Sequence, residues 1–372
     1  MASYFDAIHA SALYHQLACL QRATPPAELP SQLNGFCALQ LRMEELLREG
    51  DVSPRVCANV LWSMAYLVDV LPSSSLLSAL ILHLPSKAGA MDAQQLSNSL
   101  WATAQLCHSM PLVFSAGELQ KMVLVLVAGI SCKANDMIPQ HLSNCMWATA
   151  QLKDLIPDVL KLVPTLVARI PAQVERMIPQ HLANCMWAAA RLRLSAASDV
   201  ANLVPALAGQ IGRKAGQMNR QELSNCIWAS AHLLDVAPGH LAKLVPILVV
   251  QICRHSTPMI PQQVSTSLWA AAILKNSTPD VLKMVPGLAH EARAQADEMT
   301  PQALCTCLWA SAHFKELPEM QIWPALLSRI SLKISDMNLQ DLCNTCWALV
   351  VLLDADESRI HSRIRWKGVE IG

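Results

Sequence analysis

The sequence predicts an all-α protein, built as an α-solenoid of about eight helical-hairpin repeats of roughly 40 residues each. The first observation is a series of tryptophans: Trp62, Trp101, Trp147, Trp187, Trp228, Trp269, Trp309 and Trp347, with gaps of 39, 46, 40, 41, 41, 40 and 38 residues. The second is a phrase that returns around them, as in residues 137–152 and 177–192. A fixed period of this length indicates stacked units rather than one closed globule.

The repeats divide the chain into three parts. Residues 51–353 are predicted to form the eight-repeat array, whose last repeat is incomplete. Residues 1–50 are expected to be capping helices or a partly disordered lead, and residues 354–372 a tail. The lead has no hydrophobic core of a secretory signal and no clear transit peptide.

The first helix of each repeat is predicted to start near a proline eight residues before the tryptophan and to run to about five residues past it. Proline is favoured at the first helical position, where its missing N–H costs nothing. This proline is present in five repeats: Pro54, Pro139, Pro179, Pro261 and Pro301.

The second helix is predicted to begin at Thr/Pro/Asp clusters such as residues 157–158 and 278–280. Internal prolines at Pro164, Pro205, Pro246 and Pro286 are expected to mark a kink or a restart. The wider gap between Trp101 and Trp147 contains Gly117 and predicts an enlarged turn there.

Composition excludes several classes of protein. Hydrophobic residues make up 53% of the chain, yet the apolar stretches 122–132 and 70–86 fall short of the roughly 20 residues that span a bilayer, so we expect no membrane segment. The thirteen cysteines, with no secretory signal, indicate a reduced intracellular compartment. The Cys343–Cys346 pair is interpreted as packing, and no metal, cofactor or small-molecule substrate is expected.

One face of the first helix carries a repeated polar and aromatic stripe. Positions minus seven, minus three, zero and plus four, counted from the tryptophan, share this face by helical spacing. The stripe reads Gln140, Asn144, Trp147, Gln151; then Gln180, Asn184, Trp187, Arg191; then Gln221, Asn225, Trp228, His232; then Gln262, Thr266, Trp269, Ile273; then Gln302, Thr306, Trp309, His313.

The stripe admits a structural and a functional interpretation. A tryptophan in every unit is typical of a wedge between neighbouring hairpins, and the asparagines can form a hydrogen-bonded ladder to the adjoining turn. Alternatively, amides and arginine read base edges while aromatic rings stack on bases. Base discrimination would then need the variable positions, plus four (Gln105, Gln151, Arg191, His232, Ile273, His313) and minus six (Gln95, His141, His181, Glu222, Gln263, Ala303, Asp341).

Charge is neutral overall but mildly basic in the middle of the chain. Residues 131–333 hold 18 Lys/Arg and 13 Asp/Glu. Basic side chains such as Lys161, Arg213 and Lys243 are expected to neutralise the phosphates of a polyanion. The sequence has no glycine-rich phosphate loop, no HExxH motif and no recognisable nucleophile arrangement, so we predict no catalytic residues and no enzyme.

The recurring phrase Pro-Gln-x-Leu-x-Asn-x-x-Trp-Ala-x-Ala-x-Leu resembles the octotricopeptide repeat family and the related heptatricopeptide-type repeats, over about residues 51–353. The resemblance implies a helical-repeat protein that binds single-stranded RNA in chloroplasts or mitochondria and acts in transcript stability, processing or translation. The leading hypothesis is sequence-selective RNA binding, with other protein subunits as possible partners. The rival is a protein-binding scaffold of the same architecture without RNA contact.

Overall fold

The computed structural model describes residues 6–23, 33–50, 52–68, 74–110 and 115–367. Within this part of the chain there are seventeen α-helices and no strand, which confirms the all-α prediction. Within each compact unit the helices pack chiefly against their neighbours along the chain or the helix one repeat away, as a solenoid requires. Among these residues no helix has the length and apolarity needed to cross a bilayer.

Within each of the two compact units of the chain, the helices alternate between two layers. The first helices are α1 (Ala7–Ala23), α3 (Pro54–Leu67), α5 (Ala93–Ser109), α7 (Pro139–Leu152), α9 (Pro179–Leu192), α11 (Arg220–His232), α13 (Pro261–Leu274), α15 (Pro301–His313) and α17 (Leu339–Lys367). The second helices are α2 (Leu33–Glu49), α4 (Ser74–Lys87), α6 (Ala116–Lys133), α8 (Val163–Gln173), α10 (Ala197–Lys214), α12 (Pro238–Arg254), α14 (Val285–Ala294) and α16 (Trp323–Lys333).

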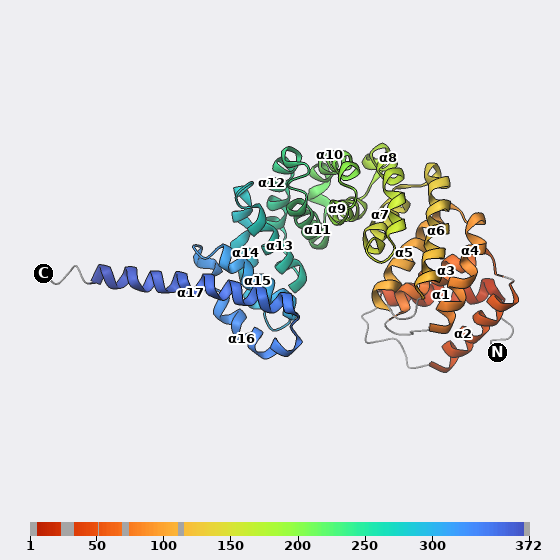
Figure 1. Ribbon diagram of the computed structural model, residues 1–372, viewed down its shortest axis with the longest axis horizontal. Helices are drawn as coiled ribbons and strands as arrows, with labels where there is room; N and C mark the ends of the chain where they lie inside the picture. Colours follow the sequence, from red (N-terminus) through yellow and green to blue (C-terminus); the bar gives the residue numbers. More distant parts are fainter. Residues whose placement is uncertain (1–5, 24–32, 51, 69–73, 111–114, 368–372) are drawn as a thin grey trace. The chain divides into compact units, whose positions relative to one another are not determined.

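The chain forms two compact units, Met1–Leu207 and Ala208–Gly372, whose boundary falls within α10. In the first unit α1, α3, α5, α7 and α9 pack in sequence, and α2, α4, α6 and α8 cover them. In the second unit α11, α13, α15 and α17 form the same kind of row, with α12, α14 and α16 against it (Figure 1). Within the first unit α1 contacts α3 as α3 contacts α5, so a hairpin precedes the first tryptophan repeat.

Small residues allow the first helices to approach closely. Alanine occupies plus three in the first seven repeats, and all seven are buried: Ala65, Ala104, Ala150, Ala190, Ala231, Ala272 and Ala312. The hairpins are equally tight at Gly129 of α6, where a Cβ atom would stand 2.9 Å from Leu96 Cδ2 of α5. Close packing of apolar helices on two sides explains the high hydrophobic content.

A repeated side-chain bond closes five of the hairpins in the described part of the chain. The residue at or just past the end of the second helix donates to the carbonyl of the methionine that stands ten residues before the tryptophan. The pairs are Lys133 to Met91, Gln173 to Met137 at 2.6 Å, His255 to Met218 at 2.9 Å, Gln295 to Met259 at 2.7 Å and Lys333 to Met299 at 2.6 Å. The bond satisfies a backbone carbonyl in the link that leads into the first helix.

The internal prolines lie in two settings, and the predicted restart occurs at two of them. Pro164 and Pro286 lie in the first turn of α8 and α14, directly after the 3₁₀ segments η4 (Pro157–Leu162) and η7 (Pro279–Met284), so the second helix restarts there. Pro205 and Pro246 lie inside the continuous helices α10 and α12.

The enlarged turn expected between Trp101 and Trp147 stays a prediction, because most of the link between α5 and α6 is outside the described residues. Gly117 lies in the first turn of α6, which is N-capped by Ser115. The wider gap is used in part by longer helices, since α5 has 17 residues and α6 has 18. Residues 111–114 lie outside the described part of the chain.

Candidate functional site

The stripe on the first helices is accessible to solvent. Glutamines at minus seven are exposed in repeats two to eight: Gln94, Gln140, Gln180, Gln221, Gln262, Gln302 and Gln340. The residues at minus three are half-buried: Asn59, Asn98, Asn144, Asn184, Asn225, Thr266, Thr306 and Asn344. The rest of each first helix is largely buried against its neighbours, so this stripe is the face that a ligand can reach.

In the part of the chain that the structure describes, five stripe amides make no side-chain hydrogen bond. Among the described residues, the side chains of Asn144, Asn184 and Asn225 make no hydrogen bond, and those of Gln262 and Gln302 make none either. The hydrogen-bonded asparagine ladder to the adjoining turn is therefore not formed in this part of the structure. Each amide offers one acceptor and two donor hydrogens to an external partner.

The tryptophans join successive repeats. In the first unit, ring centroids lie 6.2 Å apart for Trp101 and Trp147 and 6.3 Å apart for Trp147 and Trp187. In the second unit, Trp309 and Trp347 lie 6.0 Å apart. The rings contact one another as an inter-repeat wedge would, yet all stay at least partly accessible, so both interpretations of the stripe keep a physical basis.

Aromatic side chains at plus four fill the space between consecutive tryptophans. The ring centroid of Tyr66 lies 4.6 Å from that of Trp62 and 5.1 Å from that of Trp101. His232 lies 4.2 Å from the Trp228 ring and stacks on Trp269 at 4.7 Å.

His313 has the same place between two tryptophans, 3.9 Å from Trp309 and 5.1 Å from Trp347. Burial, with a smaller effect of the Lys275 charge, lowers its pKa. Arg191 instead extends over its own Trp187 at 5.5 Å and remains exposed. Plus four is thus partly a packing position, and Arg191 presents the most accessible polar group there.

The side chain at minus six caps the start of the first helix in three repeats. Gln95 and Glu222 form capping boxes with Asp92 and Asn219, respectively. Asp341 exchanges backbone-to-side-chain hydrogen bonds with Asn338 in the same way. The residue three places into a helix can reach back to the N-cap backbone, which explains the preference for Gln, Glu and Asp at this position. The expectation that minus six discriminates bases is therefore not supported for these repeats.

A groove follows the stripe in the second unit. Its volume is about 770 Å³, and its lining comes from α11, α13, α15 and the start of α17. It contains the predicted residues Trp228, His232, Gln262, Thr266, Trp269, Gln302, Thr306 and Trp309, together with Gln340 and Asn344. The structure thus brings four consecutive repeats to one surface. Among the described lining residues none is a lysine or an arginine, and Asp341 is the acidic one.

A second groove, of about 760 Å³, lies in the first unit along α1, α3 and α5. Its stripe residues are Arg55, Asn59, Gln94 and Asn98, with His15 from α1. His15 stacks on Trp62 at 5.3 Å and so takes the tryptophan's place in the leading hairpin. Arg55, Asn59, Gln94 and Asn98 were not among the predicted site residues, although their register relative to Trp62 and Trp101 identifies them.

The predicted phosphate-binding side chains lie in the other layer. Lys161 is on η4, Arg213 on α10 and Lys243 on α12, all in second helices or their lead-in. Lys161 Nζ lies 2.6 Å from an oxygen of Asp158, and Arg213 Nε donates to Gln210 at 2.7 Å. None of the three lines either groove, because these residues follow the second-helix pattern and not the stripe register.

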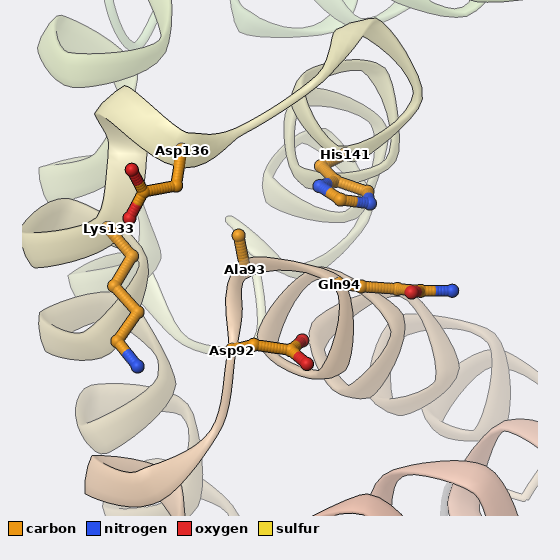
Figure 2. Close-up of a pocket in the computed structure, with 6 residues that line it drawn as sticks. All are labelled: Asp92, Ala93, Gln94, Lys133, Asp136 and His141. Carbon is orange, nitrogen blue, oxygen red and sulfur yellow. The ribbon is translucent and has the colours of Figure 1, made fainter.

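A smaller pocket of about 310 Å³ lies beside the junction of α5 and α7. Figure 2 shows the His141 ring of α7 above the Gln94 side chain of α5. Asp92 lies at the start of α5, and Lys133 and Asp136 lie at and just after the end of α6. Burial lowers the pKa of His141, opposed by the charge of Asp92. In the described part of the chain its buried Nδ1 has no hydrogen-bond partner.

The repeated cysteines are packing residues. Cys145, Cys185, Cys226 and Cys307 are fully buried. Burial raises the pKa of the Cys185 and Cys307 thiols to about 12, which leaves them protonated and unreactive at neutral pH. Cys343 and Cys346 are exposed on α17.

The fold and this stripe define a helical tandem-repeat protein of the α-solenoid class. No family model matches the chain, and no curated protein matches it significantly. One solved structure to which it is similar is a "circular tandem repeat protein with novel repeat topology and enhanced subunit contact surfaces". That match has 10% identity and a TM-score of 0.30, and covers 94% of this chain and 99% of the other.

Proposed function

We propose that this chain binds single-stranded RNA through the stripe on its first helices, in the manner implied by its resemblance to octotricopeptide repeats. The observation that carries the proposal is a row of amides that have no hydrogen-bond partner among the described residues, set beside partly accessible tryptophans in one groove. Amides hydrogen-bond base edges, and aromatic faces stack on unpaired bases. The same resemblance suggests a role in organellar transcript stability, processing or translation, without catalysis.

The groove also limits how RNA would be held. With no lysine or arginine in the described lining of the second-unit groove, the phosphates would stay largely outside it. Affinity would come from base contacts more than from counterion release. A duplex, whose base edges are already paired and stacked, is expected to bind poorly.

The same observation favours a second candidate, a scaffold that binds an extended peptide. Uncharged amides can bond a peptide backbone as readily as base edges, and a neutral groove does not attract a polyanion. The two proposals differ in their ligand and agree on the surface.

The experiment is a binding measurement of the 372-residue chain with a randomised single-stranded RNA pool. The test variant is Gln262→Ala with Gln302→Ala, and the matched control is Gln217→Ala with Asn276→Ala, two exposed amides outside the groove. Loss of two amide contacts is expected to cost about 2 kcal/mol, or roughly thirtyfold in affinity, with the control unchanged.

Two outcomes would reject the RNA proposal. The first is the absence of RNA binding by the intact chain even at low salt, which would leave the peptide scaffold. The second is RNA binding that both double variants weaken equally, because contact would then not run through the groove.

A further inference from the structure

The groove along α1, α3 and α5 contains a cation of a kind that the described lining of the second-unit groove lacks. Arg55 stands at minus seven in the first repeat, where the seven later repeats all have glutamine. Its side chain is exposed and forms no salt bridge or hydrogen bond with any residue that the structure describes. Arg55 also lies in the first turn of α3, where the helix dipole favours an anion. The first-unit groove is therefore suited to a negatively charged group.

The same groove is lined by a buried hydroxyl group. Ser11 of α1 is 3% exposed, yet its hydroxyl makes no hydrogen bond among the described residues. Buried polar groups in proteins nearly always have a partner, because leaving one without a hydrogen bond costs free energy. Ser11 therefore indicates a ligand that accepts a hydrogen bond inside the groove.

Two further side chains of the lining can donate to the same ligand. Ser53 Oγ accepts from the Val56 backbone N–H at 3.4 Å, which leaves its own hydroxyl hydrogen for another partner. His15 Nδ1 lies 3.8 Å from Cys19 Sγ. When Nδ1 accepts from this thiol, the ring hydrogen is on Nε2, which has no partner among the described residues. The groove thus combines a guanidinium, two hydroxyls and an imidazole, all of them hydrogen-bond donors.

The one acidic side chain in the described lining of this groove is engaged at the start of a helix. Asp92 accepts from the Gln95 backbone N–H at 2.8 Å and from Gln95 Nε2 at 2.7 Å, as the cap of α5. It forms no ion pair with Arg55. The positive charge of Arg55 is therefore left for an anion from outside the chain.

We infer that the first-unit groove binds the terminal phosphate monoester of an RNA strand, an inference that rests on the proposed RNA binding. A phosphate monoester carries about −1.5 to −2 charges at pH 7 and has three acceptor oxygens. A guanidinium bonds two such oxygens at once, and the hydroxyls of Ser11 and Ser53 are donors for the third. Internal phosphodiesters recur with every nucleotide, whereas the cation at minus seven occurs once in the array. A single cationic site therefore matches the end of a strand better than its interior.

Competition binding tests this inference with one randomised single-stranded RNA pool in three forms: with a 5′-phosphate, with a 3′-phosphate, and with hydroxyls at both ends. The 372-residue chain is compared with Arg55→Gln, which places at minus seven the residue of the later repeats. The matched control is Arg48→Gln, an exposed arginine at the end of α2. The wild type and the control are expected to bind one phosphorylated pool on the order of tenfold more tightly than the hydroxyl pool.

The two groove variants are expected to act on this preference alone. Arg55→Gln should remove it and leave the affinity for the hydroxyl pool unchanged. Ser11→Ala should reduce it a few-fold, and because Ser11 makes no hydrogen bond among the described residues, the fold should keep its stability. Circular dichroism and urea denaturation of each variant confirm folding.

The outcomes separate this inference from the RNA proposal. Equal affinity of the wild type for the three pools would overturn the terminal-phosphate inference while RNA binding stands. So would an Arg55→Gln variant that weakens all three pools alike, because Arg55 would then contact an internal phosphate. Absence of binding by every pool rejects both proposals. A phosphoserine peptide library that competes as well as the phosphorylated RNA would also overturn the inference, because the groove would then select phosphate on any chain.

Discussion

At the scale of single residues, the tryptophans have two roles, since each contacts a neighbouring repeat and keeps part of its ring accessible. A half-buried ring contributes less to stability than a fully buried one. It also retains an edge or face that a base or side chain can contact. The structural and the functional interpretation of the stripe are therefore compatible. They differ in how much each tryptophan is expected to contribute to stability and to ligand binding.

Trp147→Ala is expected to lower the free energy of unfolding by about 2–3 kcal/mol, because Trp147 contacts Trp101 on one side and Trp187 on the other. Trp347→Ala should cost less, since Trp347 is 43% exposed. Urea denaturation followed by circular dichroism measures both. Equal losses for the two variants would show that the inter-repeat contacts contribute little.

Acidification is expected to destabilise the fold through His141 and His313. Burial lowers the pKa of both below the usual value of 6.5, so the unfolded chain binds protons more readily than the folded chain. Well above pH 6.5 both histidines are neutral in the folded and the unfolded chain, so they leave the free energy of unfolding unchanged. As the pH falls below 6.5, the unfolded chain takes up protons that the folded chain does not, and the free energy of unfolding decreases. The urea midpoint should drop between about pH 7.5 and pH 5, and less so in His141→Gln than in the exposed-site control His240→Gln. If the two variants respond alike, His141 does not take part.

At the scale of helices, the starts and ends are held by several different devices. Proline begins α3, α7, α9, α13 and α15, whereas α5 and α11 have capping boxes. In α11, Arg220 stands where five other first helices have proline, and its side chain binds the end of α12. Its guanidinium donates to the carbonyls of Ile252, His255 and Thr257 at the end of α12 and lies 3.6 Å from Glu291.

Arg220→Ala is expected to destabilise the chain by about 2–3 kcal/mol, because a largely buried cation with several carbonyl partners is removed from the end of α12. Arg254→Ala, an exposed arginine at the end of the same helix, is the matched control with a small expected effect. Thermal or urea unfolding compares the two. Similar stability of both variants would mean that water replaces the guanidinium without loss.

At the scale of the whole molecule, the basic side chains predicted to bind phosphate are separated from the grooves along the stripe. The chain has no net charge, and the basic side chains expected to meet phosphate lie on the second helices. RNA affinity is therefore expected to depend weakly on salt, with a slope of log K against log salt shallower than about −2. Lys161→Ala, Arg213→Ala and Lys243→Ala together should change that slope little. A steep slope that this triple variant flattens would place the RNA on the second-helix layer.

From the sequence we could predict the helical-repeat architecture, the register of each first helix and the membership of the stripe. These follow from local periodicity: a tryptophan near every 40 residues, prolines that start helices, and polar residues at helical spacing. Such signals need no knowledge of distant contacts. The capping boxes at minus six are also predictable from the sequence. Asp92 and Gln95, like Asn219 and Glu222, have the spacing between N-cap and N3 residues that a capping box requires.

The environment of each stripe position, in contrast, depends on how the repeats pack against one another. Sequence spacing assigns both Asn184 and His232 to the stripe. Packing of adjacent repeats leaves the Asn184 amide without a hydrogen bond among the described residues, whereas it holds the His232 ring between Trp228 and Trp269. The separation of Lys243 from the groove depends likewise on which helices meet in space. Contacts between repeats join residues about 40 positions apart, and the pattern within one repeat carries no information on how side chains share that space.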